Sequence, residues 1–591
     1  MHYAAGMNGR AIFHSHRACR DGWSLALEQP RRVLCATALD EVIPALRAID
    51  QATHRGQWAA LMLAYEAAPA FDPALKTHAP GNFPLLWAGI YDRPAPSLPL
   101  MPRRDELAGQ GAWEPLVGRQ EYDACIHAIR AAIHQGEAYQ VNYTIPFETA
   151  FAGDVLAWFH DLTSMQRAGY AAYLEIGEYT ILSLSPELFF RRTGDRILAR
   201  PMKGTMRRGR FAAEDAAATA ALACCPKNQA ENIMIVDLVR NDLGKLARTG
   251  SVRVADLFAV ERYPTVLQMV STVQAELEAG VGLQDIFAAL FPCGSVTGAP
   301  KASAMGIIAK LERRPRGAYC GAIGYVQPGG DCVFNVPIRS ALLDTRTSRA
   351  RMHVGGGVTW DSTARDEYAE CMTKLQFATE HRPPFSLFET LLLEQGNYFL
   401  LDWHAARLQD SAVYFGFAFD RAAFDVALAA VAAERPKGRH RIKLLLDQAG
   451  GISVKSALIG PRRTERWTLG WADWPVDSSD VFLFHKTTRR ETYDRILASH
   501  PEYQDVMMYN ERGELTESCR ANVVLKLEGK LWTPARESGL LAGTFRAELL
   551  QRGLVRECRV LLEDVERAQG MWLINSVRRW LRVELSTLRI K

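Results

Sequence analysis

Pro201-Met202-Lys203-Gly204-Thr205 is the stretch from which the rest of this 591-residue chain can be interpreted. A β-like segment precedes it at residues 196–200, and a basic turn follows it at residues 207–209. A lysine in a small, apolar loop is poorly solvated, and desolvation lowers the pKa of its amine and frees the lone pair. Lys203 is therefore a candidate nucleophile or base. The alternative is a surface lysine in a turn before glycine.

Length and composition predict a globular protein with two or more domains. A chain of 591 residues exceeds one ordinary core, and 48% hydrophobic with 23% charged residues is typical of globular rather than disordered chains. A net charge of +4 without a block of Lys or Arg gives no sign of nucleic-acid binding. We find no apolar run long enough for a membrane span and no signal-peptide core. The 11 cysteines are scattered, which favours a reducing cytoplasm.

The clearest domain boundary lies at residues 381–384, His-Arg-Pro-Pro. A helical pattern over residues 364–379 ends there, because paired prolines cannot continue a helix. We predict a first domain over residues 1–380, a linker over 381–384 and a second domain over 385–591. Both are predicted to mix strands with helices. The predicted strands lie at 182–190, 332–339, 350–354, around 394–397, 441–446 and 481–484, and the predicted helices at 121–135, 230–241, 401–414 and 545–552.

Carboxylates in apolar surroundings mark the first domain. Glu187 lies between Ser185-Pro186 and the apolar Leu188-Phe189-Phe190, where a raised pKa would suit a general acid. The alternative is a carboxylate at a strand edge that faces water. Glu367 and Glu370 are three residues apart and share a helix face, and with Glu231 they offer oxygen ligands that suit Mg²⁺. Each of these glutamates alone is equally explained as part of a solvated helix face.

Several longer motifs occur in an order that resembles the chorismate-utilising enzymes. They cover most of residues 60–378 and comprise Tyr139-Gln-Val-Asn142, Ser185-Pro-Glu187, the Lys203 pentapeptide, the helix at 230–243, Phe291-Pro-Cys-Gly-Ser-Val-Thr-Gly-Ala-Pro-Lys301, residues 317–325, Ile338-Arg339 and Gly355-Gly-Gly-Val358. The resemblance implies an α+β multidomain chain whose first domain is an α/β sandwich with large, mainly antiparallel sheets. Lys203 matches the aminodeoxychorismate synthases, since anthranilate synthases carry Ala at this position.

The resemblance also implies site roles. Lys203 would attack the chorismate ring while Glu187 protonates the departing hydroxyl, and Mg²⁺ would lie on Glu231 and Glu370 with Glu367 beside it. The substrate's oxygens and carboxylates would be held by Gly204, Thr205, Tyr319, Arg339, Lys374 and the backbone of Gly355, Gly356 and Gly357. The glycine triplet offers bare N–H groups to an anion, although most such triplets are turns. Gln268 stands where anthranilate synthases have the His tied to pyruvate elimination, so the first domain is expected to stop at aminodeoxychorismate.

The second domain carries another candidate lysine. Lys486 follows the apolar stretch 481–484, and a lysine at the end of a buried strand can be neutral enough to bond with an aldehyde. The alternative is a lysine that leaves the strand for solvent. Glu517 could bind a protonated pyridine nitrogen, and Gly543-Thr544 opens a helix that offers a phosphate site.

This domain resembles the branched-chain aminotransferase-like enzymes that use pyridoxal 5′-phosphate (PLP), which include a lyase acting on aminodeoxychorismate. The matching segments are Leu387-Phe-Glu-Thr390, residues 404–411, the Lys486 and Glu517 segments, residues 540–546 and Asn575-Ser-Val-Arg578. The resemblance implies a two-subdomain α+β domain of the fold type IV kind. Lys486 would carry PLP, Glu517 would bind the pyridinium, and Arg407 and Thr544 would hold the phosphate.

Taken together, the two resemblances predict a bifunctional enzyme that makes 4-aminobenzoate from chorismate. No glutaminase region of the Cys/His/Glu kind is evident, so ammonia is expected from a separate glutamine amidotransferase. A homodimer through the PLP domain is a further expectation. The alternatives are an anthranilate- or isochorismate-type first domain, and a second domain that is an aminotransferase or a non-catalytic docking module.

Overall fold

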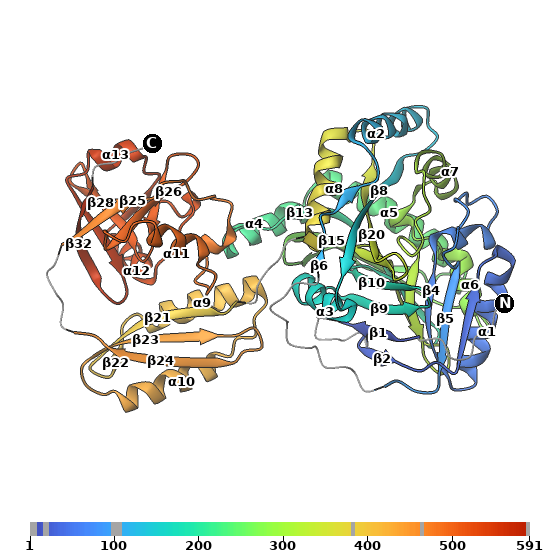
Figure 1. Ribbon diagram of the computed structural model, residues 1–591, viewed down its shortest axis with the longest axis horizontal. Coiled ribbons are helices and arrows are strands. Elements are labelled where there is room, and N and C mark those ends of the chain that lie inside the picture. The colour runs from blue at the N-terminus through green and yellow to red at the C-terminus, as the bar shows by residue number, and fades with distance from the viewer. Residues whose placement is uncertain (1–8, 16–22, 96–108, 380–384, 461–465, 587–591) are drawn as a thin grey trace. The chain divides into compact units, whose positions relative to one another are not determined.

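A computed structural model describes residues 9–15, 23–95, 109–379, 385–460 and 466–586 (Figure 1). The chain divides into two compact units, and each is described by itself. The first unit comprises residues 1–207 and 219–382, and the second comprises residues 208–218 and 383–591. Residues 208–218 thus group with the second unit, although the predicted boundaries assign them to the first domain. The predicted linker at 381–384 lies outside the described residues. No helix among the described residues is long and apolar enough to span a membrane.

The first unit is built on two antiparallel sheets. The first sheet has the order β16 (Gly298–Ala299), β8 (Gln140–Ala152), β20 (Arg349–Val358), β19 (Ser340–Asp344), β10 (Tyr179–Ser185), β9 (Tyr170–Ile176), β1 (Ala11–His14) and β2 (Leu25–Leu27), with β6 (Gly109–Gln110) and β7 (Glu114–Pro115) beside β8. The second has the order β13 (Met202–Arg207), β15 (Val266–Glu276), β12 (Arg196–Arg200), β11 (Leu188–Thr193), β18 (Cys332–Asn335), β17 (Ala322–Val326), β4 (Trp58–Leu63), β5 (Leu86–Tyr91) and β3 (Arg32–Ala36), with β14 (Arg253–Arg262) beside β15.

The two sheets pack face to face, and helices cover their outer faces. Phe13 and Leu174 of the first sheet share a buried cluster with Met62 and Tyr325 of the second. The helices are α1 (Leu39–His54), α2 (Arg119–His134), α3 (Val155–Gln166), α5 (Pro226–Gly244), α6 (Leu283–Leu290), α7 (Lys301–Leu311) and α8 (Ala364–Thr379), with the 3₁₀ turns η1 (Tyr65–Ala70) and η2 (Gly294–Val296). Helices α2, α7 and α8 cover β8 and β20, whereas α1, α5 and α6 cover the second sheet (Figure 1). The predicted sandwich is confirmed.

Two of the places where the chain crosses between the two sheets lie next to each other. Strand β10 lies in the first sheet and β11 in the second, so residues 186 and 187 form one crossover. Residues 336–339 form another, between β18 and β19. The crossovers are joined because the Ser185 hydroxyl donates to Val336 O (2.6 Å) and Val336 N donates to Glu187 O (3.2 Å). The predicted strands at 182–190 and 332–339 are therefore each interrupted, and the interruptions carry Glu187 and Arg339.

The second unit has two subdomains, as predicted. An antiparallel sheet of β22 (Asn397–Tyr398), β21 (Leu387–Glu394), β23 (Arg439–Leu446) and β24 (Ile452–Leu458) packs with α9 (Leu401–Phe415) and α10 (Arg421–Glu434). A larger mixed sheet has the order β27 (Leu515–Ser518), β26 (Asp505–Tyr509), β25 (Trp467–Trp471), β32 (Arg579–Leu585), β31 (Gly570–Asn575), β28 (Asn522–Leu527), β29 (Lys530–Pro534) and β30 (Arg556–Cys558). The remaining helices are α11 (Glu491–Ala498), α12 (Thr544–Gln551), α13 (Leu562–Glu566) and the 3₁₀ turns η3 (Val481–Leu483) and η4 (Arg536–Ser538), while α4 (Ala212–Ala223) begins in the second unit and ends in the first.

One predicted strand is wrong. Residues 481–483 form the 3₁₀ turn η3, and Asp480 caps it by accepting a hydrogen bond from Phe482 N (2.9 Å). A short apolar run is compatible with a buried turn as well as with a strand. The aspartate before it favours the turn, because its side chain caps one of the first N–H groups. Lys486 therefore follows a turn and does not end a strand.

Candidate active sites

Lys203 lies on a β-bulge of strand β13. The register with β15 shifts between Met202 and Thr205, and Gly204 within the shift has a φ of 99°, which favours glycine. Gln268 of β15 holds the bulge, because its amide donates to Gly204 O (2.9 Å) and accepts from Thr205 Oγ1 (2.9 Å). The sequence motif therefore folds as an irregular strand that fixes the lysine backbone.

The amine of Lys203 lies close to the glycine triplet of β20. A Cβ added at Gly357 would lie 2.4 Å from Lys203 Nζ and 2.0 Å from Gln140 Nε2, so a larger residue there would displace the ends of both side chains. Gln140 is completely buried, and neither polar atom of its amide has a hydrogen-bond partner among the described residues. A buried amide without partners is costly and points to a missing ligand. Gln140 stands in the motif Tyr139-Gln-Val-Asn142, from which no role was predicted for it; its signal is a polar residue in a segment that alternates polar with apolar residues.

Two glutamates and a second lysine lie against the same triplet. Lys374 Nζ donates to Gly355 O (2.7 Å) and forms an ion pair with Glu370 (2.6 Å). A Cβ added at Gly356 would lie 3.0 Å from Glu367 Oε2 and 3.6 Å from Glu370 Oε1. The triplet lies inside β20 and is therefore not a turn. Because glycines have no side chains, the triplet leaves room for these charged groups.

Burial and neighbouring charges shift the pKa values of Lys203, Glu367 and Glu370. Burial lowers the pKa of Lys203, the charge of Glu231 on α5 opposes this shift, and Lys374 adds to it. Burial raises the pKa of Glu367, and the charge of Glu370 adds to that shift. Burial would raise the pKa of Glu370 as well, but Lys374, together with Lys203 and Lys227, lowers it.

The three predicted metal ligands do not form a ready cluster. In the part of the chain that the structure describes, no group of three or more His, Cys, Asp or Glu side chains is arranged to hold a metal ion. Glu367 and Glu370 lie together beside Gly356, while Glu231 acts on the same lysine from α5. Carboxylate oxygens are the donors that Mg²⁺ prefers, and Mg²⁺ commonly completes its shell with waters and substrate oxygens. The donor types therefore fit this ion.

Glu187 is a buried carboxyl on the first crossover. Its side chain is 2% exposed and accepts a hydrogen bond from the Ser295 hydroxyl (2.7 Å). Burial raises the pKa of Glu187 to about 7, against the opposing effects of Ser295 and the nearby charge of Lys203. A carboxyl that holds its proton near neutral pH and lies within electrostatic range of a lysine can act as a general acid.

Tyr319 and Arg339 flank the strands of the crossover region. Tyr319 is almost buried, and its ring stacks on His353 of β20 (centroids 5.2 Å apart) two residues before Gly355. Arg339 has a φ of 50° on the second crossover, and no carboxylate is among the groups that shift the pKa of its guanidinium. Burial lowers the pKa of Arg339, and the nearby Tyr263 opposes that shift. A partly buried guanidinium without a carboxylate is suited to bind an anionic ligand.

The second unit presents Lys486 beside the strand β21. The carbonyl of Lys486 accepts from Phe388 N (3.0 Å), and its ammonium lies 4.6 Å from the centre of the Phe388 ring. Burial lowers the pKa of Lys486 to about 7, and the positive charge of Arg407 adds to the shift. At neutral pH, about half of such an amine is in the neutral form that acts as a nucleophile.

Glu517 of β27 is held by three donors. Its carboxylate accepts from the Tyr493 hydroxyl (3.0 Å), from Leu541 N (3.1 Å) and from Asn522 Nδ2 (3.2 Å). Burial nevertheless raises the pKa of Glu517 to about 7. A carboxyl poised in this way would gain from a cationic partner, which a protonated pyridine nitrogen supplies.

Arg407 and Thr544 are joined through a buried polar network. Glu389 binds Arg407 through two hydrogen bonds (2.9 and 2.6 Å) and also binds His404 (2.6 Å), whose other ring nitrogen lies 3.3 Å from Thr544 Oγ1. Burial alone would raise the pKa of Glu389, but Arg407 and His404 lower it to about 2. Glu389 received no role from its sequence; the signal was a charged residue between the apolar residues at the start of its strand.

These groups fit PLP by their chemistry. Lys486 offers a buried amine, and Glu517 offers a carboxyl group that can bind a pyridinium. Arg407 offers a cation for the phosphate, and the N-terminus of α12 offers N–H groups for it. The interaction of Glu517 with Lys486 is seen in the mutual effect of their charges on their pKa values. The four predicted cofactor residues are therefore supplied by one unit of the chain.

Comparison with known proteins agrees with both halves of this description. Residues 18–380 match the family model "chorismate binding enzyme", and residues 386–585 match "Amino-transferase class IV". The aminodeoxychorismate synthase component 1 of Klebsiella aerogenes is 43% identical over 265 residues, which is 45% of this chain and 58% of that protein. The chain thus spans less than three fifths of this curated relative.

Two solved structures are also similar. Anthranilate synthase component I from Streptococcus pneumoniae has a TM-score of 0.52 at 22% identity, over 64% of this chain and 92% of that one. A putative amino-acid aminotransferase from Mesorhizobium loti is 31% identical, over 34% of this chain and 100% of that one, with a TM-score of 0.33.

Proposed function

Because the chain belongs to the chorismate binding enzyme family over residues 18–380 and carries a class IV aminotransferase domain over residues 386–585, we propose that it makes 4-aminobenzoate in two steps. The first unit would convert chorismate and ammonia to 4-amino-4-deoxychorismate, and the second would convert this product to 4-aminobenzoate and pyruvate. The observation that carries the proposal is Lys203, a partly buried amine of lowered pKa among three glutamates and the glycine triplet.

The first step needs a nucleophile because ammonia must replace the ring hydroxyl at carbon 4 with retained configuration. Lys203 would add at carbon 2 as the 4-hydroxyl leaves with the proton of Glu187. Ammonia would then add at carbon 4 and expel the lysine, so two allylic displacements replace one difficult substitution. The unpaired guanidinium of Arg339 would bind a substrate carboxylate, and the amide of Gln140 would hydrogen-bond to a group beside Lys203.

Mg²⁺ would be held in the first unit by Glu367 and Glu370, with Glu231 opposite. When bound, the ion would supply positive charge to the substrate's ring carboxylate. Tyr319, Lys374, Gly204, Thr205 and the backbone of Gly355, Gly356 and Gly357 would complete the contacts to substrate oxygens. In the second unit, PLP would supply an electron sink; Lys486 would hold it covalently and move a proton, Glu517 would hold the pyridinium, and Arg407 and Thr544 would bind the phosphate.

Product analysis tests this proposal. Purified chain with chorismate, ammonium, Mg²⁺ and PLP is expected to give 4-aminobenzoate and pyruvate by mass spectrometry, and without PLP to accumulate 4-amino-4-deoxychorismate. Glutamine in place of ammonium is expected to give no product, because we propose that a separate glutamine amidotransferase supplies ammonia. Anthranilate or isochorismate as the product would refute the first step. A cytoplasmic location and a homodimer through the second unit remain predictions.

Glu187 predicts the pH dependence of the first step. Its protonated form is the donor, and its pKa is about 7, so the rate should fall as the pH rises through 7. We expect Glu187→Gln to lower kcat/KM and to remove this alkaline decline, because glutamine has no proton to lose. Glu178→Gln, at a surface carboxylate that is 59% exposed, serves as the control and should keep the wild-type profile. A persistent decline in Glu187→Gln would exclude Glu187 as the acid.

A further inference from the structure

Residues 208–218 are an insertion from the sequence of the first domain into the second unit. They begin directly after strand β13, five residues beyond Lys203. Arg208 and Asp215 anchor the segment with two hydrogen bonds (2.9 and 2.8 Å), and their side chains are only 7% and 6% exposed. Arg208 also donates to Tyr414 O (3.0 Å), and the Tyr414 hydroxyl donates to Gly209 O (2.7 Å). The segment is therefore packed as part of the second unit.

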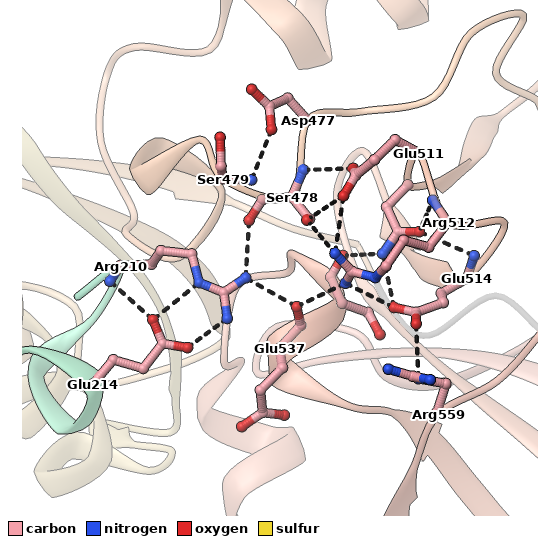
Figure 2. Close-up of polar contacts among 12 residues, drawn as sticks. Arg210, Glu214, Asp477, Ser478, Ser479, Glu511, Arg512, Glu514, Glu537 and Arg559 are labelled. Carbon is pink, nitrogen blue, oxygen red and sulfur yellow. Dashed lines mark hydrogen bonds and ion pairs between the residues drawn. The ribbon is translucent and has the colours of Figure 1, made fainter. Parts of the chain in front are cut away.

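Arg210 joins the segment to a polar network of the second unit (Figure 2). Its guanidinium binds Glu214 and donates to Ser478 O and Glu537 O, each at 3.0 Å. Ser478 is itself held by Glu511 through its backbone N–H (2.9 Å) and its hydroxyl (2.6 Å). The side chain of Arg210 therefore uses acceptors that neighbouring groups of the unit already fix in place (Figure 2).

Phe211 adds an apolar anchor. It is 5% exposed and stacks on Phe484, with ring centroids 5.4 Å apart, and the Arg536 guanidinium carbon lies 3.8 Å from the centre of the Phe211 ring. Phe211 belongs to the same buried cluster as Leu483, Phe484 and Tyr493. Burying one aromatic ring in such a cluster is a substantial apolar contribution for so short a segment.

One residue connects the segment to each of two candidate cofactor residues: His485 connects it to Lys486, and Tyr493 connects it to Glu517. The carbonyl of Arg210 can only accept, so His485 Nε2 carries the proton and donates to it (3.1 Å), and His485 Nδ1 accepts from the Ser411 hydroxyl (2.9 Å). His485 immediately precedes Lys486. Tyr493, which shares the Phe211 cluster, donates to Glu517.

We propose that residues 208–218 are a positioning segment of the second active site. Arg210 fixes His485, the residue before Lys486, and Phe211 fixes Tyr493, which orients Glu517. The inference rests on the proposed binding of PLP by Lys486 and Glu517. Neither Arg210 nor Phe211 needs to touch the cofactor or the substrate. The second unit would consequently depend on a stretch of chain that lies, in sequence, between two motifs of the first.

The test compares full-length variants by PLP affinity and by the visible spectrum of bound PLP as a function of pH. We expect Phe211→Ala and Arg210→Ala each to raise the Kd for PLP about tenfold, because the unanchored lysine and carboxyl must be ordered on binding. The pH midpoint of the absorbance change should shift as well. The amination of chorismate by the first unit should stay at the wild-type rate, which shows that the chain is folded.

Matched controls separate positioning from stability. Phe424→Ala removes a ring of equal size that is completely buried elsewhere in the unit, and Arg421→Ala removes a surface arginine that pairs with Asp425. Both should leave the Kd and the pH midpoint unchanged in the folded protein. Phe211→Leu keeps an apolar side chain and should restore much of the affinity. If Phe211→Ala does not fold, Arg210→Ala carries the test.

The outcomes distinguish this inference from the proposed function. Wild-type chain that fails to bind PLP would refute the PLP role of Lys486 and the inference with it. Wild-type chain that binds PLP, while folded Arg210→Ala, together with Phe211→Ala where it folds, matches it within twofold in Kd and pH midpoint, would refute the positioning role alone. An equal loss in Phe424→Ala would also refute it, because the effect would then follow stability.

Discussion

Lys203→Ala is expected to lose at least about 10³-fold in the rate of 4-amino-4-deoxychorismate formation, equivalent to about 4 kcal/mol of barrier. The reason is that alanine removes the amine whose addition would split the substitution at carbon 4 into two steps. The loss should be measured from chorismate and ammonium by mass spectrometry. The same variant should convert added 4-amino-4-deoxychorismate at the wild-type rate, since the second unit is untouched.

Two further variants make this result specific. Lys203→Arg keeps the positive charge but removes a usable nucleophile, so it should be as inactive as Lys203→Ala. Lys245→Ala removes a lysine that is 54% exposed and pairs with Asp242, and it should leave the rate unchanged. Substantial activity in Lys203→Arg would show that the residue acts only through its charge, and the covalent mechanism would have to be abandoned.

The regular elements of the first unit were predictable because their sequence patterns are long. Residues 121–135 and 230–241 show helical periodicity, and they match α2 (Arg119–His134) and α5 (Pro226–Gly244) to within four residues at each end. The strand at 350–354 is part of β20. Local pattern is reliable in such segments because the apolar face of each element agrees with the side that the core covers.

The crossovers and the turn before Lys486 were not predictable in the same way. Nothing in the run 182–190 shows that its two halves belong to different sheets, because that depends on pairing with β19 and β18. This pairing buries Glu187. The apolar run 481–484 satisfies a strand pattern, and only its contacts and the Asp480 cap make it a turn.

The roles of residues whose partners lie far away in the chain could not be predicted from the sequence either. Gln140 is notable because its buried amide has no partner beside Lys203, and Glu389 because it binds His404 and Arg407. Arg210 and Phe211 lie within the predicted first domain, yet their contacts lie in the second unit. A linear pattern records residue type and spacing, whereas these properties are created by packing between segments far apart in the chain.

Lys486→Ala is expected to stop 4-aminobenzoate formation by at least about 10³-fold while 4-amino-4-deoxychorismate accumulates. The variant lacks the amine of pKa about 7 that would hold PLP and move the proton, so the visible absorbance of bound PLP should also disappear. Lys443→Ala is the matched control, because its ammonium lies 4.9 Å from the same Phe388 ring that Lys486 contacts at 4.6 Å, but its side chain is exposed. Only the Lys486 variant should separate the two steps. Continued 4-aminobenzoate production in Lys486→Ala at the wild-type rate would remove Lys486 from the reaction, and loss of activity in both variants would point to the Phe388 surface instead of the buried amine.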